Sequence, residues 1–171
     1  MKTGDEYLMN VSKKTIIIRI ISLLAVVATA VAIFSFSAQP AEESKKVSDK
    51  VVEFVEKSRP LDAMMPDKKS EKSTRVREYA HMLLYLVLGV SGGIFAFTFD
   101  IRLWIKPLGA AAFCLLYSLS DEFHQRFVDG RAFELKDLLM YAAGYLAGIA
   151  IVAAVCYIII KKAKKFRRNS I

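Results

Sequence analysis

The chain has 171 residues, 54% of them apolar, and a formal net charge of +8. This length suits a single domain, and the apolar residues gather in blocks long enough to cross a bilayer, which takes about twenty residues per helix. A soluble helical bundle is the alternative, but a helix such as 138–160, which contains no charge, rarely occurs in one.

Four apolar blocks predict membrane spans, at residues 16–36, 79–99, 103–119 and 138–160. The first block is too long for the apolar core of a typical signal peptide, although small residues at its end could imitate a cleavage site. The third block is short for a span, but its helix continues into residues 120–124. We therefore expect an all-α polytopic membrane protein, a bundle of four transmembrane helices.

Charge at the two ends of the chain predicts the orientation. The tail 161–171 is basic and has no acidic residue, and Lys13, Lys14 and Arg19 flank the first span. The positive-inside rule places such segments in the cytoplasm. We expect a cytoplasmic segment 1–15, a four-span domain 16–160 and a cytoplasmic tail 161–171, in a multi-pass protein of the cell membrane.

The outer loop 37–78 is polar and contains a predicted helix at about 42–58. Val47, Val51 and Phe54, with Val55, recur at helical spacing and form one apolar stripe. Such an amphipathic helix lies in the membrane interface, caps the bundle or binds a partner. We expect it to cap the bundle on the extracytoplasmic side.

Small residues in the fourth span predict close helix packing. Gly144 and Gly148 are four residues apart, and such a face lets another helix approach closely. We expect the partner to be another span of the same chain, with a homodimer as the alternative. Cys114 and Cys156 lie at different depths of their spans, so we expect no disulfide between them.

Polar residues at the span ends are predicted to meet on one membrane face. With four spans, the end of the first and third and the start of the second and fourth all lie outside. Charged residues at a membrane boundary need water or partners, so a dense cluster there is a candidate functional site. The residues concerned are Ser37, Gln39, Glu78, His81, Tyr85, Asp121, Glu122, His124, Gln125, Arg131, Asp137 and Tyr141.

Three interpretations of this cluster remain open. His81, His124 and Glu122 could bind zinc, for which nitrogen and oxygen ligands are suitable, although no known metal-binding spacing is present. Alternatively, Asp121, Glu122, His124, His81 or Asp137 could act as general acid and base without a metal. In the third interpretation the groups form a ligand pocket or a structural network, since buried ion pairs often specify a helix arrangement.

The turn between the last two spans bears on ligand binding. Val128-Asp129-Gly130-Arg131 is typical of a tight turn, in which Gly130 adopts positive φ. We expect Arg131 to point back at the site, where its planar fork suits a carboxylate or phosphate, and Arg126 to be a solvated loop residue. The predicted ligand-binding residues are Ser37, Gln39, His81, Tyr85, Gln125 and Arg131.

These motifs resemble the VanZ-like family. The resemblance covers residues 20–150 and is carried by Ser37-x-Gln39, by His81 with Tyr85, and by Asp121-Glu122-x-His124-Gln125-x-Phe127-x-x-x-Arg131 followed by Asp137. It implies a small multi-pass protein of the bacterial cell envelope with a possible role in resistance to glycopeptides, teicoplanin in particular.

The chain departs from the family pattern at two positions. Tyr141 stands where members often have asparagine, and Glu78 stands where they often have lysine. We expect membrane lipids and a lipid-linked cell-wall precursor, envelope lipid or lipoglycopeptide as partners, and no nucleic acid. The alternative is a membrane enzyme that modifies a lipid or glycan with Glu122 and His124, with or without zinc.

Overall fold

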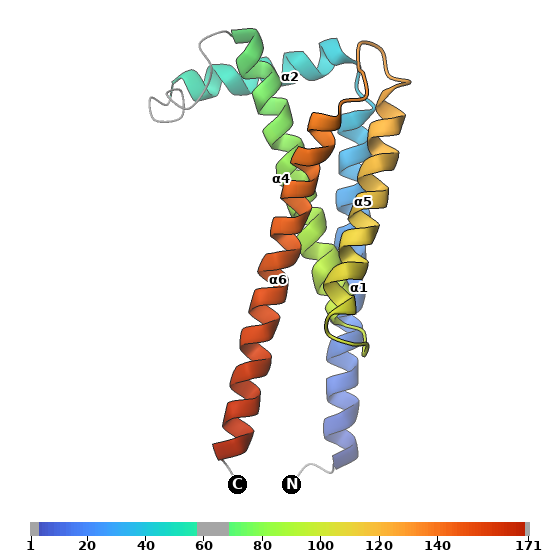
Figure 1. Ribbon diagram of the computed structural model, residues 1–171, viewed down its shortest axis with the longest axis vertical. Coiled ribbons are helices and arrows are strands. Elements are labelled where there is room, and N and C mark those ends of the chain that lie inside the picture. Colours follow the sequence, from blue (N-terminus) through green and yellow to red (C-terminus); the bar gives the residue numbers. More distant parts are fainter. Residues whose placement is uncertain (1–3, 58–68, 170–171) are drawn as a thin grey trace.

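The computed structural model describes residues 4–57 and 69–169, which form five α-helices. Four long helices run along the long axis of the molecule, and the remaining one, α2, lies across one end of them (Figure 1). The start of α1 and the end of α6 lie together at the other end. The helices are α1 (Gly4–Ser37), α2 (Ala41–Glu56), α4 (Lys69–Phe97), α5 (Ile105–Gln125) and α6 (Leu135–Asn169).

Three of these helices are long and apolar enough to cross a membrane. They contain the segments Lys13–Ser37, Glu71–Phe97 and Leu135–Ala163. Helix α5 is not among them, because Lys106 near its start and Asp121 and Glu122 near its end lower its hydropathy. The prediction of an all-α membrane protein is thus confirmed. Three of the four predicted spans correspond to helices that are long and apolar enough to cross a membrane.

Most helices extend beyond the apolar blocks. The second predicted span began at residue 79, whereas α4 begins at Lys69, so part of the predicted outer loop is helical. Helix α6 likewise continues into the basic tail as far as Asn169. Hydropathy marks only the part of a helix that suits lipid, while Lys, Arg and Glu are good helix formers in water. The structure therefore adds polar helical ends to the predicted spans.

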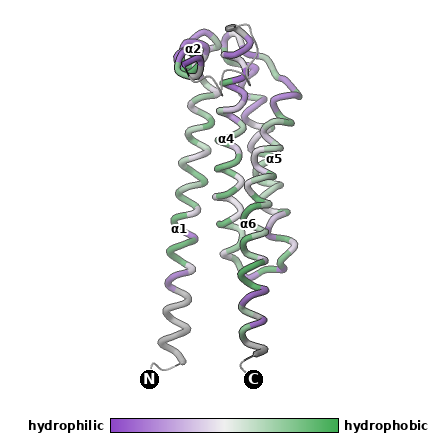
Figure 2. Tube along the Cα trace, turned by 90° about the vertical axis from the view of Figure 1, so that its left-hand side faces the viewer, coloured by the Kyte–Doolittle hydropathy of each residue, from purple (hydrophilic) through white to green (hydrophobic). Residues whose placement is uncertain are grey.

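The polarity of the bundle is the reverse of that in a soluble protein. Large apolar side chains such as Leu24, Leu116 and Leu139 are more than 60% exposed, whereas Ser37, Ser118 and Glu122 are fully buried. In Figure 2 the apolar colour runs along the middle of the long helices, and the polar colour gathers at α2 and near the helix ends. An apolar surface of this extent is stable only against lipid or another apolar partner. This arrangement argues against the soluble-bundle alternative.

Glycines allow α4 and α6 to pack backbone against backbone. A Cβ atom on Gly144 or Gly148 would collide with the carbonyl oxygen of Met82 or Leu86 on α4. Gly89 of α4 faces the backbone of α6 in the same way. The expectation that the small-residue face of the fourth span meets another span of the same chain is confirmed.

The charge inside the first span is satisfied at the end of α4. Arg19 donates to the Thr98 carbonyl oxygen at 2.8 Å and to the Thr98 hydroxyl at 3.1 Å. Its guanidinium also lies 4.3 Å from the ring centroid of Phe99. The last carbonyls of a helix lack intrahelical donors and carry partial negative charge, so a cation is favourable there. Arg19 thereby joins α1 to α4 near the end that holds the termini.

Helix α2 confirms the predicted helix of the outer loop but not its burial pattern. The buried side chains are Ser44, Ser48 and Val52, which recur at intervals of four. The predicted apolar stripe is more exposed, with Val47 at 50% and Phe54 at 71%. Next to a membrane an apolar side chain gains nothing by turning to a protein core rather than to lipid. Small hydroxyl residues instead let α2 pack closely on α4.

Candidate functional site

The buried carboxylate of Asp121 joins three helices at the end of the bundle that α2 covers. Its Oδ2 accepts a hydrogen bond from the Ser37 hydroxyl of α1 at 3.0 Å and one from the Tyr85 hydroxyl of α4 at 3.1 Å. Ser37 and Tyr85 are fully buried, and Asp121 is nearly so. Each of these residues was predicted from the sequence to lie at this site, and the structure brings them into direct contact.

His81, which is also buried, extends this network along α4. Its Nε2 lies 3.4 Å from the Ser37 Oγ, and its Nδ1 lies 3.1 Å from the carbonyl oxygen of Arg77. A carbonyl oxygen only accepts, so Nδ1 carries a proton. Ser37 has a single proton and stands between two groups that can accept it, His81 Nε2 and the Asp121 carboxylate. The Ser37 hydroxyl donates to Asp121 Oδ2 at 3.0 Å, so it cannot donate to His81 Nε2 at the same time.

Gln125 gathers the remaining polar groups. Its amide nitrogen lies 3.4 to 3.5 Å from oxygen atoms of Ser37, Asp121, Glu122 and Tyr141. These contacts are long for hydrogen bonds, so the amide nitrogen is surrounded by four oxygen atoms and makes a strong hydrogen bond to none of them. Its carbonyl oxygen accepts from Arg131 at 3.1 Å.

Arg131 closes the site from the turn before α6. Its Nε donates to the Gln39 carbonyl oxygen and one terminal nitrogen donates to that of Phe36, both at 3.0 Å. Phe36 lies in the last turn of α1 and Gln39 just beyond it, where carbonyls lack the regular helical donor; the Phe36 carbonyl also accepts a long bond from the Gln39 N–H at 3.4 Å. The turn itself has the predicted form, with Gly130 at φ 72°. Arg131 thus points at the site as expected, and protein acceptors engage each of its three nitrogens, while Arg126 is exposed.

Aromatic rings form the floor of the site. Tyr85 and Tyr141 stack with centroids 4.4 Å apart and an interplanar angle of 15°. The His81 ring lies 5.8 Å from that of Tyr141. Tyr141, which the resemblance marked as a departure from the family pattern, therefore packs at the centre of the cluster.

The two remaining acids have different surroundings. Glu122 is fully buried, and its Oε1 accepts the backbone N–H of Glu134 at 2.8 Å, just before α6 begins. Asp137 lies in the first turn of α6, partly buried and close enough to Arg77 and Glu122 to interact with them electrostatically. Both acids flank the Asp121 network.

His124 lies apart from the hydrogen-bonded network. Its ring stacks on Phe34 of α1 with centroids 4.7 Å apart, and its Nε2 is buried without a hydrogen-bond partner among the described residues. Within residues 4–57 and 69–169, no group of three or more His, Cys, Asp or Glu side chains could hold a metal ion. The proposed zinc ligands His81, His124 and Glu122 are therefore not assembled into such a group.

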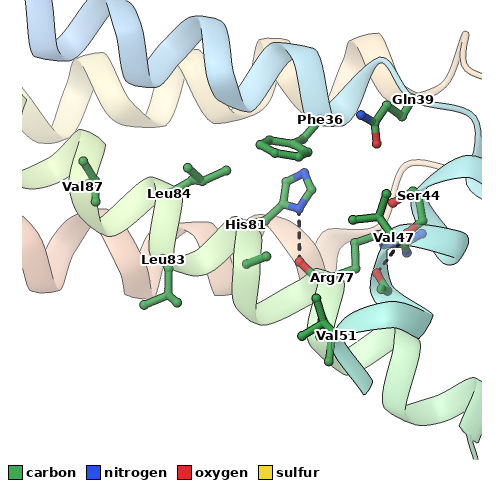
Figure 3. A pocket seen from close by; sticks show the side chains of 13 residues that line it. Phe36, Gln39, Ser44, Val47, Val51, Arg77, His81, Leu83, Leu84 and Val87 are labelled. Atoms are coloured by element: carbon green, nitrogen blue, oxygen red, sulfur yellow. Dashed lines mark hydrogen bonds between the residues drawn. The ribbon is translucent and has the colours of Figure 1, made fainter. Parts of the chain in front are cut away.

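A largely apolar cavity of about 380 Å³ adjoins the network beneath α2 (Figure 3). His81 and Gln39 are the predicted site residues that line it. In Figure 3 the His81 ring lies beside Phe36, and Arg77 extends from α4 toward α2. The other lining residues are Ser44, Val47, Ser48, Val51, Val76, Ala80, Leu83, Leu84 and Val87.

The sequence did not single out two parts of this region as belonging to the site. One is the face of α2 that contains Ser44 and Ser48. Their spacing of four residues is helical, but the apolar stripe of valines predicted a different buried face. The other is Arg77, which lines the cavity. A further pair, Lys136 and Glu78 at 2.6 Å, joins α6 to α4 next to the site. Glu78 thus pairs with Lys136 at the edge of the site.

Comparisons with known proteins agree with the motifs. Neither the curated proteins nor the solved structures include a significant match to this chain. The family model described as VanZ/LLP1 matches residues 21–160, which contain nearly all of the bundle and every residue of the Asp121 network. The chain belongs to the VanZ/LLP1 family.

Proposed function

We propose that this VanZ/LLP1 family protein binds an amphiphilic molecule of the bacterial envelope at the end of the bundle covered by α2. The observation that carries the proposal is that His81 belongs both to the buried polar network and to the wall of the apolar cavity. An apolar chain in that cavity would place its polar end beside His81 and Gln39. Binding sites commonly combine an apolar lining with a few placed polar groups in this way.

The proposal includes four membrane crossings with both termini in the cytoplasm. Helices α4 and α6 both run away from the end where α2 lies, so the chain must return between them (Figure 1). Helix α5 makes that return, and its 21 residues would be about 31 Å long, close to the thickness of the hydrocarbon core. Its acids lie at the covered end, where they are buried against the other helices rather than against lipid.

Cysteine labelling tests this topology. In a variant whose two native cysteines are replaced by alanine, single cysteines at Arg102 and Asp129 mark the two ends of α5. Asp129→Cys should react with an impermeant maleimide in intact cells, and Arg102→Cys should react only after lysis. Labelling of both positions from the same side would show that α5 does not cross the membrane. Labelling of Arg102→Cys alone in intact cells would show that the orientation is the opposite of the one proposed.

We further propose that occupancy of this site by an envelope lipid, a lipid-linked cell-wall precursor or a lipoglycopeptide alters access of teicoplanin to its target. The geometry supports binding better than acid–base catalysis at Glu122 and His124. Glu122 accepts a backbone hydrogen bond, and His124 stacks on Phe34. No hydrogen bond joins these two side chains in the described part of the structure.

Filling the cavity tests the function. Val87→Phe should occupy part of the space beneath α2, because Val87 lines the cavity from α4. Val27→Phe, on the exposed face of α1, is the matched control. The expected result is that Val87→Phe alone lowers the amount of lipid that co-purifies, measured by mass spectrometry, and lowers teicoplanin resistance in an expressing strain. Equal lipid content in both variants and the parent would refute the proposal.

A further inference from the structure

A second, more polar recess adjoins the cavity beneath α2. Arg77 and Ser48 line both spaces. The recess has a volume of about 210 Å³, and its remaining lining residues are Ala41, Lys45, Ser73 and Thr74. An apolar space and a polar space therefore share one wall, formed by an arginine of α4 and a serine of α2.

The recess is positively charged. Two of its six lining residues are cations, Lys45 and Arg77, and none is acidic. Within the described residues, the Arg77 guanidinium makes no hydrogen bond or ion pair, although it is partly buried. It is close enough to His81, Arg131 and Asp137 to interact with them electrostatically. Two acids offset part of the positive charge, Asp137 near Arg77 and Asp49, which accepts a hydrogen bond from the lining residue Ser73. A partly buried guanidinium without a direct partner is costly, and an anion bound in the recess would supply one.

The apolar cavity runs from this charge along α4. Its lining extends from Val76 through Leu84 to Val87, a distance of about 16 Å along the helix. Ligand cavities generally have volumes of about 300–1,000 Å³. The cavity beneath α2, at about 380 Å³, is near the lower end of this range, so it suits one hydrocarbon chain better than two. The charged end lies where α2 crosses the bundle, at the boundary between apolar and polar surface (Figure 2).

We infer that the site selects an anionic phospholipid, with one acyl chain in the cavity beneath α2 and the phosphate-bearing headgroup at Arg77 and Lys45. This inference rests on the proposed function and specifies its ligand class. Arginine suits a phosphate because its planar fork can make two parallel hydrogen bonds. Lys45 is exposed and adds mainly charge, so Arg77 is the principal determinant.

Lipid binding to the full chain tests the inference. The purified protein is delipidated in detergent and titrated with phosphatidylglycerol or phosphatidylcholine of identical chains, and the one-to-one complex is measured by native mass spectrometry. Arg77→Gln should weaken phosphatidylglycerol binding about tenfold, the value expected for one charge-assisted contact. Phosphatidylcholine, whose choline cation offsets the charge of its phosphate, should lose less, so the preference for phosphatidylglycerol should shrink. Lys45→Gln should have a smaller effect in the same direction.

Matched variants separate charge from folding. Arg126→Gln removes an exposed arginine at the same end of the bundle, and Lys46→Gln removes an exposed lysine beside Lys45 on α2. Neither should change the preference for phosphatidylglycerol. Arg77→Lys keeps the charge but lacks the planar fork, so it should retain a preference for phosphatidylglycerol and lose less affinity than Arg77→Gln. Partial retention in this variant would exclude a general loss of structure as the cause.

The outcomes distinguish this inference from the proposed function. Equal binding of both lipids by the parent protein would overturn the anionic selectivity while leaving amphiphile binding in place. An unchanged lipid preference in Arg77→Gln would also overturn it. If the parent protein binds neither lipid, both this inference and the proposed function are refuted.

Discussion

The Ser37 hydroxyl lies 3.0 Å from Oδ2 of Asp121, and this contact joins the last turn of α1 to the last turn of α5. The two residues are 84 positions apart in the chain. The other oxygen of the same carboxylate, Oδ1, is buried without a partner among the described residues. Asp121 therefore depends on the few donors that reach Oδ2.

Replacing Ser37 should destabilise the bundle. Ser37→Ala removes one of the donors to the buried Asp121 carboxylate, and a hydrogen bond to a charged group contributes about 1.5–3 kcal/mol. Thermal unfolding in detergent, followed by circular dichroism, measures the change. Ser35→Ala is the control on the same helix, because its exposed hydroxyl bonds only to the carbonyl of Val31 and its loss should change little.

The α4–α6 contact should not tolerate added side-chain volume. Gly148→Leu places atoms where the backbone of α4 lies, and no flexible side chain can move away. We expect loss of the folded protein, detected as aggregation in size-exclusion chromatography. A Cβ atom on Gly109, an exposed residue of α5, would meet nothing within 4 Å, so Gly109→Leu should elute like the parent. Identical behaviour of the two variants would contradict the close packing described for Gly148.

Arg131 should not be replaceable by lysine. The guanidinium reaches two carbonyls at the end of α1 and the Gln125 side chain at once, whereas an ammonium group is a compact point charge on a flexible stem. Arg131→Lys should lower the unfolding free energy by about 1–3 kcal/mol. Arg126→Lys, at an exposed position, should leave the same unfolding measurement unchanged.

Tyr141 should contribute mainly through its ring. Its hydroxyl has a long contact of 3.4 Å with Gln125 and a further contact with the Glu122 carboxylate, whereas its ring stacks directly on Tyr85. Tyr141→Phe should cost under about 1 kcal/mol, and Tyr141→Ala about 3–5 kcal/mol, as for a buried aromatic side chain. Unfolding curves of the two variants, compared with the parent, test this order, which a dominant hydroxyl contact would reverse.

Glu122 offers a test between binding and catalysis. Glu122→Gln keeps an oxygen that accepts the Glu134 N–H but cannot act as a general base. We expect this variant to keep its fold, its bound lipid and any teicoplanin phenotype, whereas Glu122→Ala should unfold more easily. Loss of phenotype in a folded, lipid-bound Glu122→Gln variant would instead favour the enzymatic alternative.

The positions of the membrane helices could be predicted from the sequence because lipid imposes a long apolar run on each span. Each of the four blocks corresponds to a helix, and alternation of direction alone predicted that Ser37, His81 and Asp121 lie at one end. The small-residue face containing Gly144 and Gly148 was also readable, because close helix approach requires small side chains. Local spacing was sufficient for each of these features.

Only the tertiary structure decided which polar residues touch and what they face. Asp121, three residues before His124, meets Ser37, whereas the His124 ring turns to Phe34, since the rotation of α5 about its axis depends on its packing. The buried face of α2 is a second case, because an apolar stripe beside a membrane can turn to lipid as readily as to protein. Arg77 lines a cavity only because α2 crosses over α4, and the sequence pattern of neither helix specifies that crossing.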